Sequence, residues 1–110
     1  MIEVSGLCKQ FEVRDRRAAF ALRSTVRRVT AVNNVSFVAR DGEVTGLLGP
    51  NGAGKTTTLR MLSTLLTPDS GSARIDGHDS ARDRAQVRRS MGVLGDAKGL
   101  YWRLTARENI

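Results

Sequence analysis

The feature that most constrains this sequence is a nine-residue loop from Gly49 to Thr57, which reads GPNGAGKTT. Its spacing, Gly-x-x-x-x-Gly-Lys-Thr, is typical of a loop that wraps phosphate groups with its backbone amides. Glycine is needed there because a side chain would block the approach of the backbone to the anion. A helix that begins near Lys55 would add unpaired N–H groups and the positive end of its dipole. The pattern therefore predicts a phosphate-binding site.

Residue types in the loop suit separate parts of that chemistry. Lys55 would bring a full positive charge to the outer phosphates, Thr56 a hydroxyl ligand for Mg²⁺, and Thr57 a hydroxyl donor to an inner phosphate. A plain glycine turn made soluble by a lysine would not need the ordered apolar segments on either side. The predicted nucleotide-binding residues are Gly49, Pro50, Asn51, Gly52, Ala53, Gly54, Lys55, Thr56 and Thr57.

The flanks of the loop predict an α/β fold with a P-loop core sheet. Residues 43–48 are a short, mostly apolar run suited to a strand in the centre of a sheet. After the loop, residues 57–66 place leucines at helical spacing, and Pro68 ends that helix. Strand, glycine loop and helix thus follow one another in the order that phosphate binding requires.

The remaining sequence predicts an antiparallel β part beside this core, and a chain that belongs to one domain. Strands are expected at 2–7 and 31–38, an edge strand at 72–76, a turn at 77–79, a polar helix at 83–89 and a buried strand at 91–95. Residues 105–108 fit a capping box that opens a further helix. Because a domain rarely ends within a helix's first turn, we expect residues 1–110 to be the N-terminal portion of a single domain.

The net charge of +7 is the one unusual bulk property, and six of the basic residues are arginines between Arg14 and Arg28. A short amphipathic helix and an ordered loop both fit the arginine-rich segment 12–30. The charge is compatible with nucleic acid, anionic lipid or plain solvation. Phe20 is the only aromatic residue in this segment, so the stacking groups typical of single-strand binding are scarce and nucleic acid is not favoured.

Bulk features place the chain in the cytoplasm. No apolar run approaches the roughly 20 residues that a membrane-spanning helix needs, and residues 1–7 lack the pattern of a secretory signal. The single Cys8 cannot form an internal disulfide and is interpreted as a small buried strand residue.

Three blocks of sequence together resemble the nucleotide-binding domain of ATP-binding cassette (ABC) transporters. They are Val35 to Thr57, the stretch Leu66 to Gly77, and the block Leu100 to Asn109, which is similar to the segment after the family's Q-loop. Around these blocks, the resemblance covers nearly the whole chain except the arginine-rich segment 12–30, which is interpreted as an insertion. Within the family, the chain is most similar to ATPase subunits of bacterial exporters of the sodium-efflux and multidrug type.

That resemblance implies a subunit that binds ATP and Mg²⁺, dimerises with a second ATPase subunit, and works with a polytopic permease at the cytoplasmic face of the membrane. It makes Phe11 the candidate for stacking on adenine, with Phe20 as a second candidate and a core role for Phe11 as the alternative. A gap-free alignment puts Asp96 at the position of the family's metal-sensing glutamine. Asp96 is thus a candidate metal ligand beside Thr56, and a surface carboxylate is the alternative. Tyr101 and Trp102 would suit a contact with the permease, or packing within the domain.

The resemblance assigns no catalytic residue within 1–110. The family's second acidic motif, water-activating glutamate, signature and switch histidine would all follow Ile110. His78 comes too early for the switch and is interpreted as an exposed turn residue. We therefore expect this chain to bind nucleotide without hydrolysing it alone, and the full protein to be a transport ATPase. The alternatives are a cassette ATPase that acts on nucleic acid or ribosomes, and an inactive fragment that only binds nucleotide.

Overall fold

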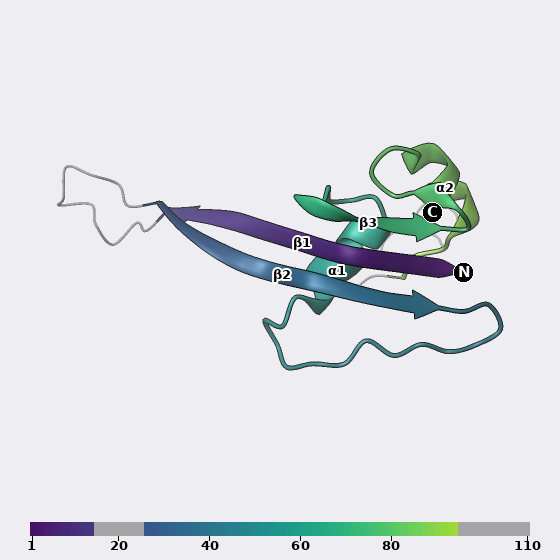
Figure 1. Ribbon diagram of the computed structural model, residues 1–110, viewed down its shortest axis with the longest axis horizontal. Helices are drawn as coiled ribbons and strands as arrows, with labels where there is room; N and C mark the ends of the chain where they lie inside the picture. The colour runs from purple at the N-terminus through teal and green to yellow at the C-terminus, as the bar shows by residue number, and fades with distance from the viewer. Residues whose placement is uncertain (15–25, 95–110) are drawn as a thin grey trace, which may run out of the picture.

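The computed structural model describes residues 1–14 and 26–94, and Figure 1 shows them as one antiparallel sheet with two helices packed beside it. Four strands hydrogen-bond in the order β2-β1-β3-β4. The elements are β1 (Ile2–Arg14), β2 (Val26–Ala39), α1 (Lys55–Leu62), β3 (Ser70–Ile75), β4 (His78–Asp79) and α2 (Arg84–Ser90). The N-terminal antiparallel part of the predicted fold is therefore present.

Beyond the body of the sheet, β1 and β2 continue as a two-stranded ribbon. β1 pairs with β2 along its length, from Ile2 opposite Ala39 to Arg14 opposite Val26. Its pairing with β3 ends earlier, at Cys8 opposite Ser70. Residues 9–14 and 26–30, here called the hairpin arm, therefore project away from the rest of the molecule (Figure 1). The described ends of the arginine-rich segment are strands; residues 15–25 lie outside the described part.

A small apolar core joins the sheet to α1 and α2. Its centre includes Leu7 from β1, Met61 from α1 and Val87 from α2, all with no exposed surface. Partly buried side chains such as Val35 and Phe37 extend it along β2, where burial alternates as a strand predicts. The other members of the core are Val4, Val32, Leu62, Ala73 and Ile75.

The prediction of a strand at 43–48 is wrong for the structure. These residues leave β2 at a turn and run back beneath the sheet without strand pairing (Figure 1). Val44 and Leu48 are almost fully exposed, at 103% and 93%. A strand requires a hydrogen-bonded neighbour, and within the described residues none pairs with this segment.

The second predicted buried strand, 91–95, is also wrong over the four residues that are described. Met91–Leu94 adopt no strand, and Leu94 is 93% exposed. Gly95 and the capping box at 105–108 lie outside the described residues. The same explanation applies as for 43–48, since an apolar run becomes a strand only where a partner lies alongside.

The helices agree with the sequence more closely, although α1 is shorter than predicted. It begins at Lys55 but ends at Leu62, because Thr64 has a left-handed φ of 65° that reverses the chain. The carbonyl of Arg60 accepts the amides of both Leu65 and Leu66 there, at 2.9 and 3.1 Å. α2 lies within one residue of its prediction, and Cys8 is a half-buried strand residue. No helix in the described part of the chain is long and apolar enough to span a membrane.

Candidate phosphate- and base-binding site

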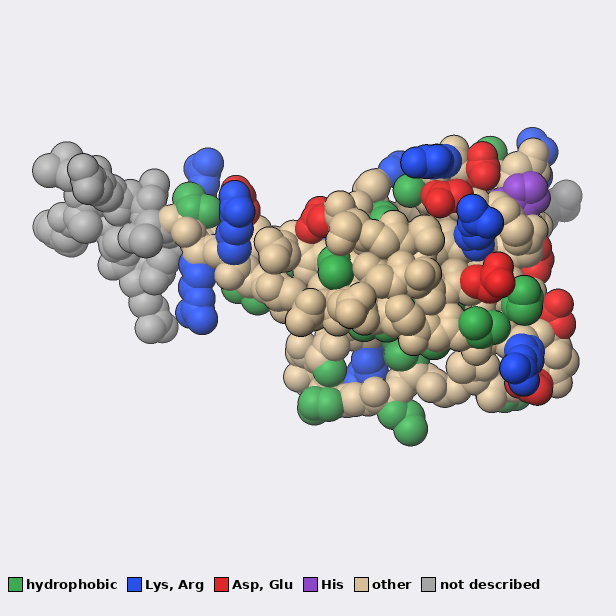
Figure 2. Space-filling view, viewed as in Figure 1, with side chains coloured by type: hydrophobic (Ala, Val, Ile, Leu, Met, Phe, Trp, Pro, Cys, Tyr) green, Lys and Arg blue, Asp and Glu red, His purple; other side chains and the backbone are tan. Residues whose placement is uncertain are grey.

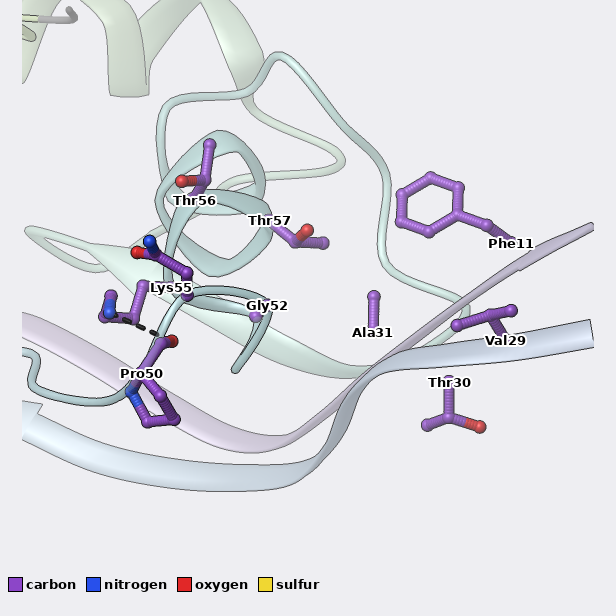
Figure 3. Close-up of a pocket in the computed structure, with 11 residues that line it drawn as sticks. Phe11, Val29, Thr30, Ala31, Pro50, Gly52, Lys55, Thr56 and Thr57 are labelled. Carbon is purple, nitrogen blue, oxygen red and sulfur yellow. Dashed lines mark hydrogen bonds between the residues drawn. The ribbon is translucent and has the colours of Figure 1, made fainter. Parts of the chain in front are cut away.

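A pocket of about 500 Å³ lies between the glycine loop and the hairpin arm (Figure 3). Its volume falls within the roughly 300 to 1,000 Å³ typical of small-molecule sites. The arm contributes Phe11, Val29 and Thr30, and the next residue of β2 contributes Ala31. The loop with the start of α1 contributes Pro50, Asn51, Gly52, Gly54, Lys55, Thr56 and Thr57. The structure thus brings Phe11 to the predicted phosphate-binding residues, although about 40 positions separate them in the sequence.

Gly54 holds the loop close to β2 at Ala31. It has a left-handed φ of 88°, and a Cβ at this position would lie 2.2 Å from the carbonyl oxygen of Ala31. Only glycine tolerates both the dihedral angle and the approach. Gly54 is also the N-cap residue of α1, and its carbonyl accepts the amide and the hydroxyl of Thr58, at 2.8 and 2.9 Å. One glycine therefore joins loop, helix and strand.

The rest of the loop is open toward solvent. Gly52 has a φ of 85°, and no protein atom lies within 4 Å of where its Cβ would be. The amide of Ala53 donates to the carbonyl of Pro50 at 3.1 Å, which closes the turn. This curled and accessible backbone, followed directly by a helix, is a shape that an anionic group can approach.

Lys55 lies over this turn. Its ammonium group donates to the carbonyl of Gly49 and, at 3.1 Å, to the carbonyl of Pro50 (Figure 3). The positive charge is thereby held beside the backbone that would surround a phosphate. An incoming phosphate oxygen is a stronger acceptor than a neutral carbonyl, because its bond to the ammonium is charge-assisted on both sides.

The first turn of α1 presents two hydroxyl groups. Thr56 is exposed and Thr57 is half-buried, and in Figure 3 the Thr57 side chain extends toward the side of the pocket where Phe11 lies. An exposed hydroxyl is a hard oxygen that fits Mg²⁺, which usually keeps several waters and adds phosphate oxygens. Among the described residues there is no cluster of three or more His, Cys, Asp or Glu that would hold a metal on its own.

Phe11 stands at the base of the hairpin arm, opposite Val29 in the register with β2. Its side chain is 39% exposed, so it is not the core residue that was the alternative interpretation. An aromatic face at the mouth of the pocket is suited to stacking on a planar base. The ammonium of Lys9 lies 5.7 Å from the centre of the ring.

Sequence reasoning missed the β2 residues Val29, Thr30 and Ala31 as part of the pocket. They follow two arginines in a stretch with no recognisable motif, and their place depends on the register that sets Val29 opposite Phe11. The candidate residues Asp96, Tyr101, Trp102 and Phe20 lie outside the described residues, so the structure does not place them. His78 is half-buried in β4, opposite Ile75, rather than an exposed turn residue.

The comparison with protein families decides the classification. A family model described as ABC transporter matches residues 32–109, which include the whole glycine loop and most of the chain. The chain belongs to the ABC transporter family. The predicted resemblance is confirmed, and nucleotide binding is the property that this family shares.

Similar curated proteins are named as ATP-binding proteins of transport or drug resistance. The ABC transporter ATP-binding protein NatA of Bacillus subtilis is 51% identical over 74% of this chain and 34% of its own length. The doxorubicin resistance ATP-binding protein DrrA of Mycobacterium tuberculosis is 49% identical over 76% of this chain and 25% of its own. The chain therefore spans about a third of the length of NatA and a quarter of the length of DrrA.

A solved structure supports the fold. An ATP-binding cassette in a dimeric, post-hydrolysis state with ADP and Pi superimposes with a TM-score of 0.76, covering 99% of this chain and 44% of that one. The two sequences are 24% identical. The predicted fold class, part of a cassette ATPase domain, is confirmed, although the described residues contain only its antiparallel strands.

Proposed function

We propose that this chain is part of an ATP-binding subunit of an ABC exporter, in which it binds MgATP for hydrolysis coupled to transport. The phosphates would lie on the Gly49–Thr57 loop and the adenine on Phe11. The observation that carries the proposal is the single pocket lined by both, because each alone occurs in many proteins. The names of the relatives, which include a transporter ATP-binding protein and a drug-resistance ATP-binding protein, support the transport role.

Replacing Lys55 by alanine tests the phosphate half of this site. Loss of a charge-assisted hydrogen bond, worth about 1.5 to 3 kcal/mol, should weaken MgATP binding by roughly ten- to more than a hundredfold. The measurement is the dissociation constant of MgATP by calorimetry. Arg60→Ala is the matched control, because it removes one positive charge from an exposed position on the same helix.

The control should bind MgATP within about twofold of the wild type, since it lies outside the pocket. Equal affinity in the wild type and Lys55→Ala would refute phosphate binding at this loop. A similar loss of affinity in both variants would show that Lys55 acts only through the net charge of the protein and not through direct contact with a phosphate.

The proposal includes two protein partners and a location. We propose that the full subunit forms a dimer with a second ATPase subunit, which closes when MgATP binds. This closure would drive a polytopic permease that the dimer contacts at the cytoplasmic face of the membrane. Asp96, Tyr101 and Trp102 stay candidates for the metal and permease contacts. No residue of 1–110 is assigned to the cleavage step, so we expect hydrolysis from the complete subunit and binding alone from residues 1–110.

The alternative, a cassette ATPase acting on nucleic acid, depends on the hairpin arm. Its described arginines Arg14, Arg27 and Arg28 are exposed, and Figure 2 shows basic side chains on both sides of the arm. Glu12 lies 3.6 Å from Arg28 and offsets part of that charge. Co-purification of the full-length subunit with a polytopic membrane protein would support transport. Salt-sensitive binding of DNA or RNA without such a partner would support the alternative.

A further inference from the structure

Asp69 joins the strand that carries Phe11 at the point where that strand leaves the sheet. β1 loses β3 as a neighbour after Cys8, whose pair is Ser70. Asp69 immediately precedes that pair, and its amide donates to the carbonyl of Cys8 at 3.0 Å. Beyond Cys8, the backbone amide of Gln10 therefore has the side chain of Asp69 as its hydrogen-bond partner, and not a residue of β3.

Both carboxylate oxygens of Asp69 are used in this contact. One accepts the backbone amide of Gln10 at 2.7 Å, and the other accepts the ammonium of Lys9 at 2.9 Å. These bonds lower the pKa of Asp69, the amide of Gln10 more than the ammonium of Lys9, so the group is ionised at neutral pH. The two residues that precede Phe11 are thus anchored to one carboxylate.

The same lysine continues the connection to the aromatic ring. Lys9 has a side chain only 15% exposed, and its ammonium lies 5.7 Å from the centre of the Phe11 ring, within the range of a cation–π contact. Lys9 does not line the pocket. The ring thus has a contact with a residue that is not part of the pocket lining.

The contact with Asp69 lies where the pairing of β1 with β2 is irregular. The register between β1 and β2 shifts on both sides of Lys9, between Leu7 and Lys9 and between Lys9 and Gln10. Such shifts twist a strand and loosen its ladder. Without a fixed point here, the orientation of the Phe11 ring would depend on a two-stranded ribbon alone.

We propose that Asp69 is a positioning residue for base recognition: through Lys9 and Gln10 it sets the Phe11 ring against the pocket. This inference rests on the proposed function, since it assumes that a purine base stacks on Phe11. It predicts that Asp69 affects recognition of the base and not of the phosphates. Asp69 follows the end of α1 by seven positions in the chain and does not line the pocket.

The test compares MgATP with magnesium tripolyphosphate, which offers phosphates without a base. Asp69→Asn should weaken MgATP binding by about three- to thirtyfold and leave tripolyphosphate binding within about twofold. Lys9→Met, which keeps an apolar stem, should show the same selectivity. Glu3→Gln is the matched control, because it removes one carboxylate from an exposed position near the start of β1.

A double variant shows whether Asp69 acts through the ring. Phe11→Ala should itself weaken MgATP binding by roughly five- to a hundredfold. In that background, Asp69→Asn should cause no further loss, because the ring it positions is gone. A merely structural role would instead lower the affinities for both ligands together and add to the effect of Phe11→Ala.

The failures can be told apart. If Phe11→Ala discriminates MgATP from tripolyphosphate but Asp69→Asn does not, the positioning role is wrong while the proposed function holds. If Phe11→Ala also leaves the two ligands unaffected, base stacking on Phe11 is wrong, and the inference with it. If wild-type protein binds neither ligand, the proposed function fails first.

Discussion

At the scale of single residues, two glycines of the loop are required for different reasons. Gly54 and Gly52 have nearly equal left-handed angles, with φ values of 88° and 85°. They differ in surroundings, because a Cβ at Gly54 would meet the Ala31 carbonyl at 2.2 Å and one at Gly52 would meet open space. Alanine at Gly52 would therefore carry only the energetic cost of the left-handed dihedral angle, whereas alanine at Gly54 would also carry the cost of the overlap with Ala31.

The two alanine variants should differ in stability. Gly52→Ala should lower the free energy of unfolding by at most about 1 to 2 kcal/mol, the cost of a left-handed alanine. Gly54→Ala adds a backbone overlap and should lower it by at least about 3 kcal/mol. Urea denaturation measures both, and Gly92→Ala, which has neither feature, is the control. Equal losses in the two loop variants would show that Gly54 does not lie as close to the carbonyl of Ala31 as the distance of 2.2 Å from its Cβ position implies.

The loop residues were predictable from sequence because their chemistry is carried by the backbone. A chain that curls round an anion needs glycine at fixed intervals, a lysine and a hydroxyl group. These residue types and their spacing can be recognised directly in the sequence. Val29 and Ala31 were not predictable in this way. Their role comes from a strand register, which no local pattern in their own sequence specifies.

At the scale of elements, α1 shows that the spacing of apolar residues can predict the wrong residues to be buried. Four leucines between 59 and 66 predict one apolar face. The helix ends at Leu62, however, and Leu65 is 71% exposed while Met61 has no exposed surface. The left-handed turn at Thr64 changes which residues face the sheet.

This difference predicts unequal effects of two similar truncations. Met61→Ala should lower the free energy of unfolding by about 2 to 5 kcal/mol, because it opens a cavity in the core. Leu65→Ala should change it by no more than about 0.5 kcal/mol. Thermal or urea unfolding of the two variants gives the comparison. A larger loss from Leu65→Ala would mean that the helix extends to 66, as its leucine spacing suggests.

The strands divide into those that the sequence could predict and those that it could not. Burial alternates along residues 2–5 of β1 and 35–39 of β2, so these parts of the sequence carry a strand signal. The runs 43–48 and 91–94 are mostly apolar and lack a regular alternation, a pattern that suits a strand only when neighbours cover both faces. Pairing partners are a property of the whole fold and cannot be read from such a run.

At the scale of the whole molecule, the central feature is the junction of two parts of the chain at one pocket. The loop comes from the segment before α1, and Phe11 comes from the hairpin arm (Figures 1 and 3). Phe11 was a candidate only through the family resemblance, since spacing does not bring residue 11 to residue 52. The close approach of Gly54 to Ala31 provides the physical reason for their meeting.

A titration of the isotopically labelled protein with MgATP, followed by NMR, tests this junction most directly. The amides of Gly52, Gly54 and Lys55 and the ring protons of Phe11 should all shift with one dissociation constant, whereas the amide of Arg74 on β3 should not. Saturation of the loop amides with no change at the Phe11 ring would contradict the account, because base and phosphates would then not share one site.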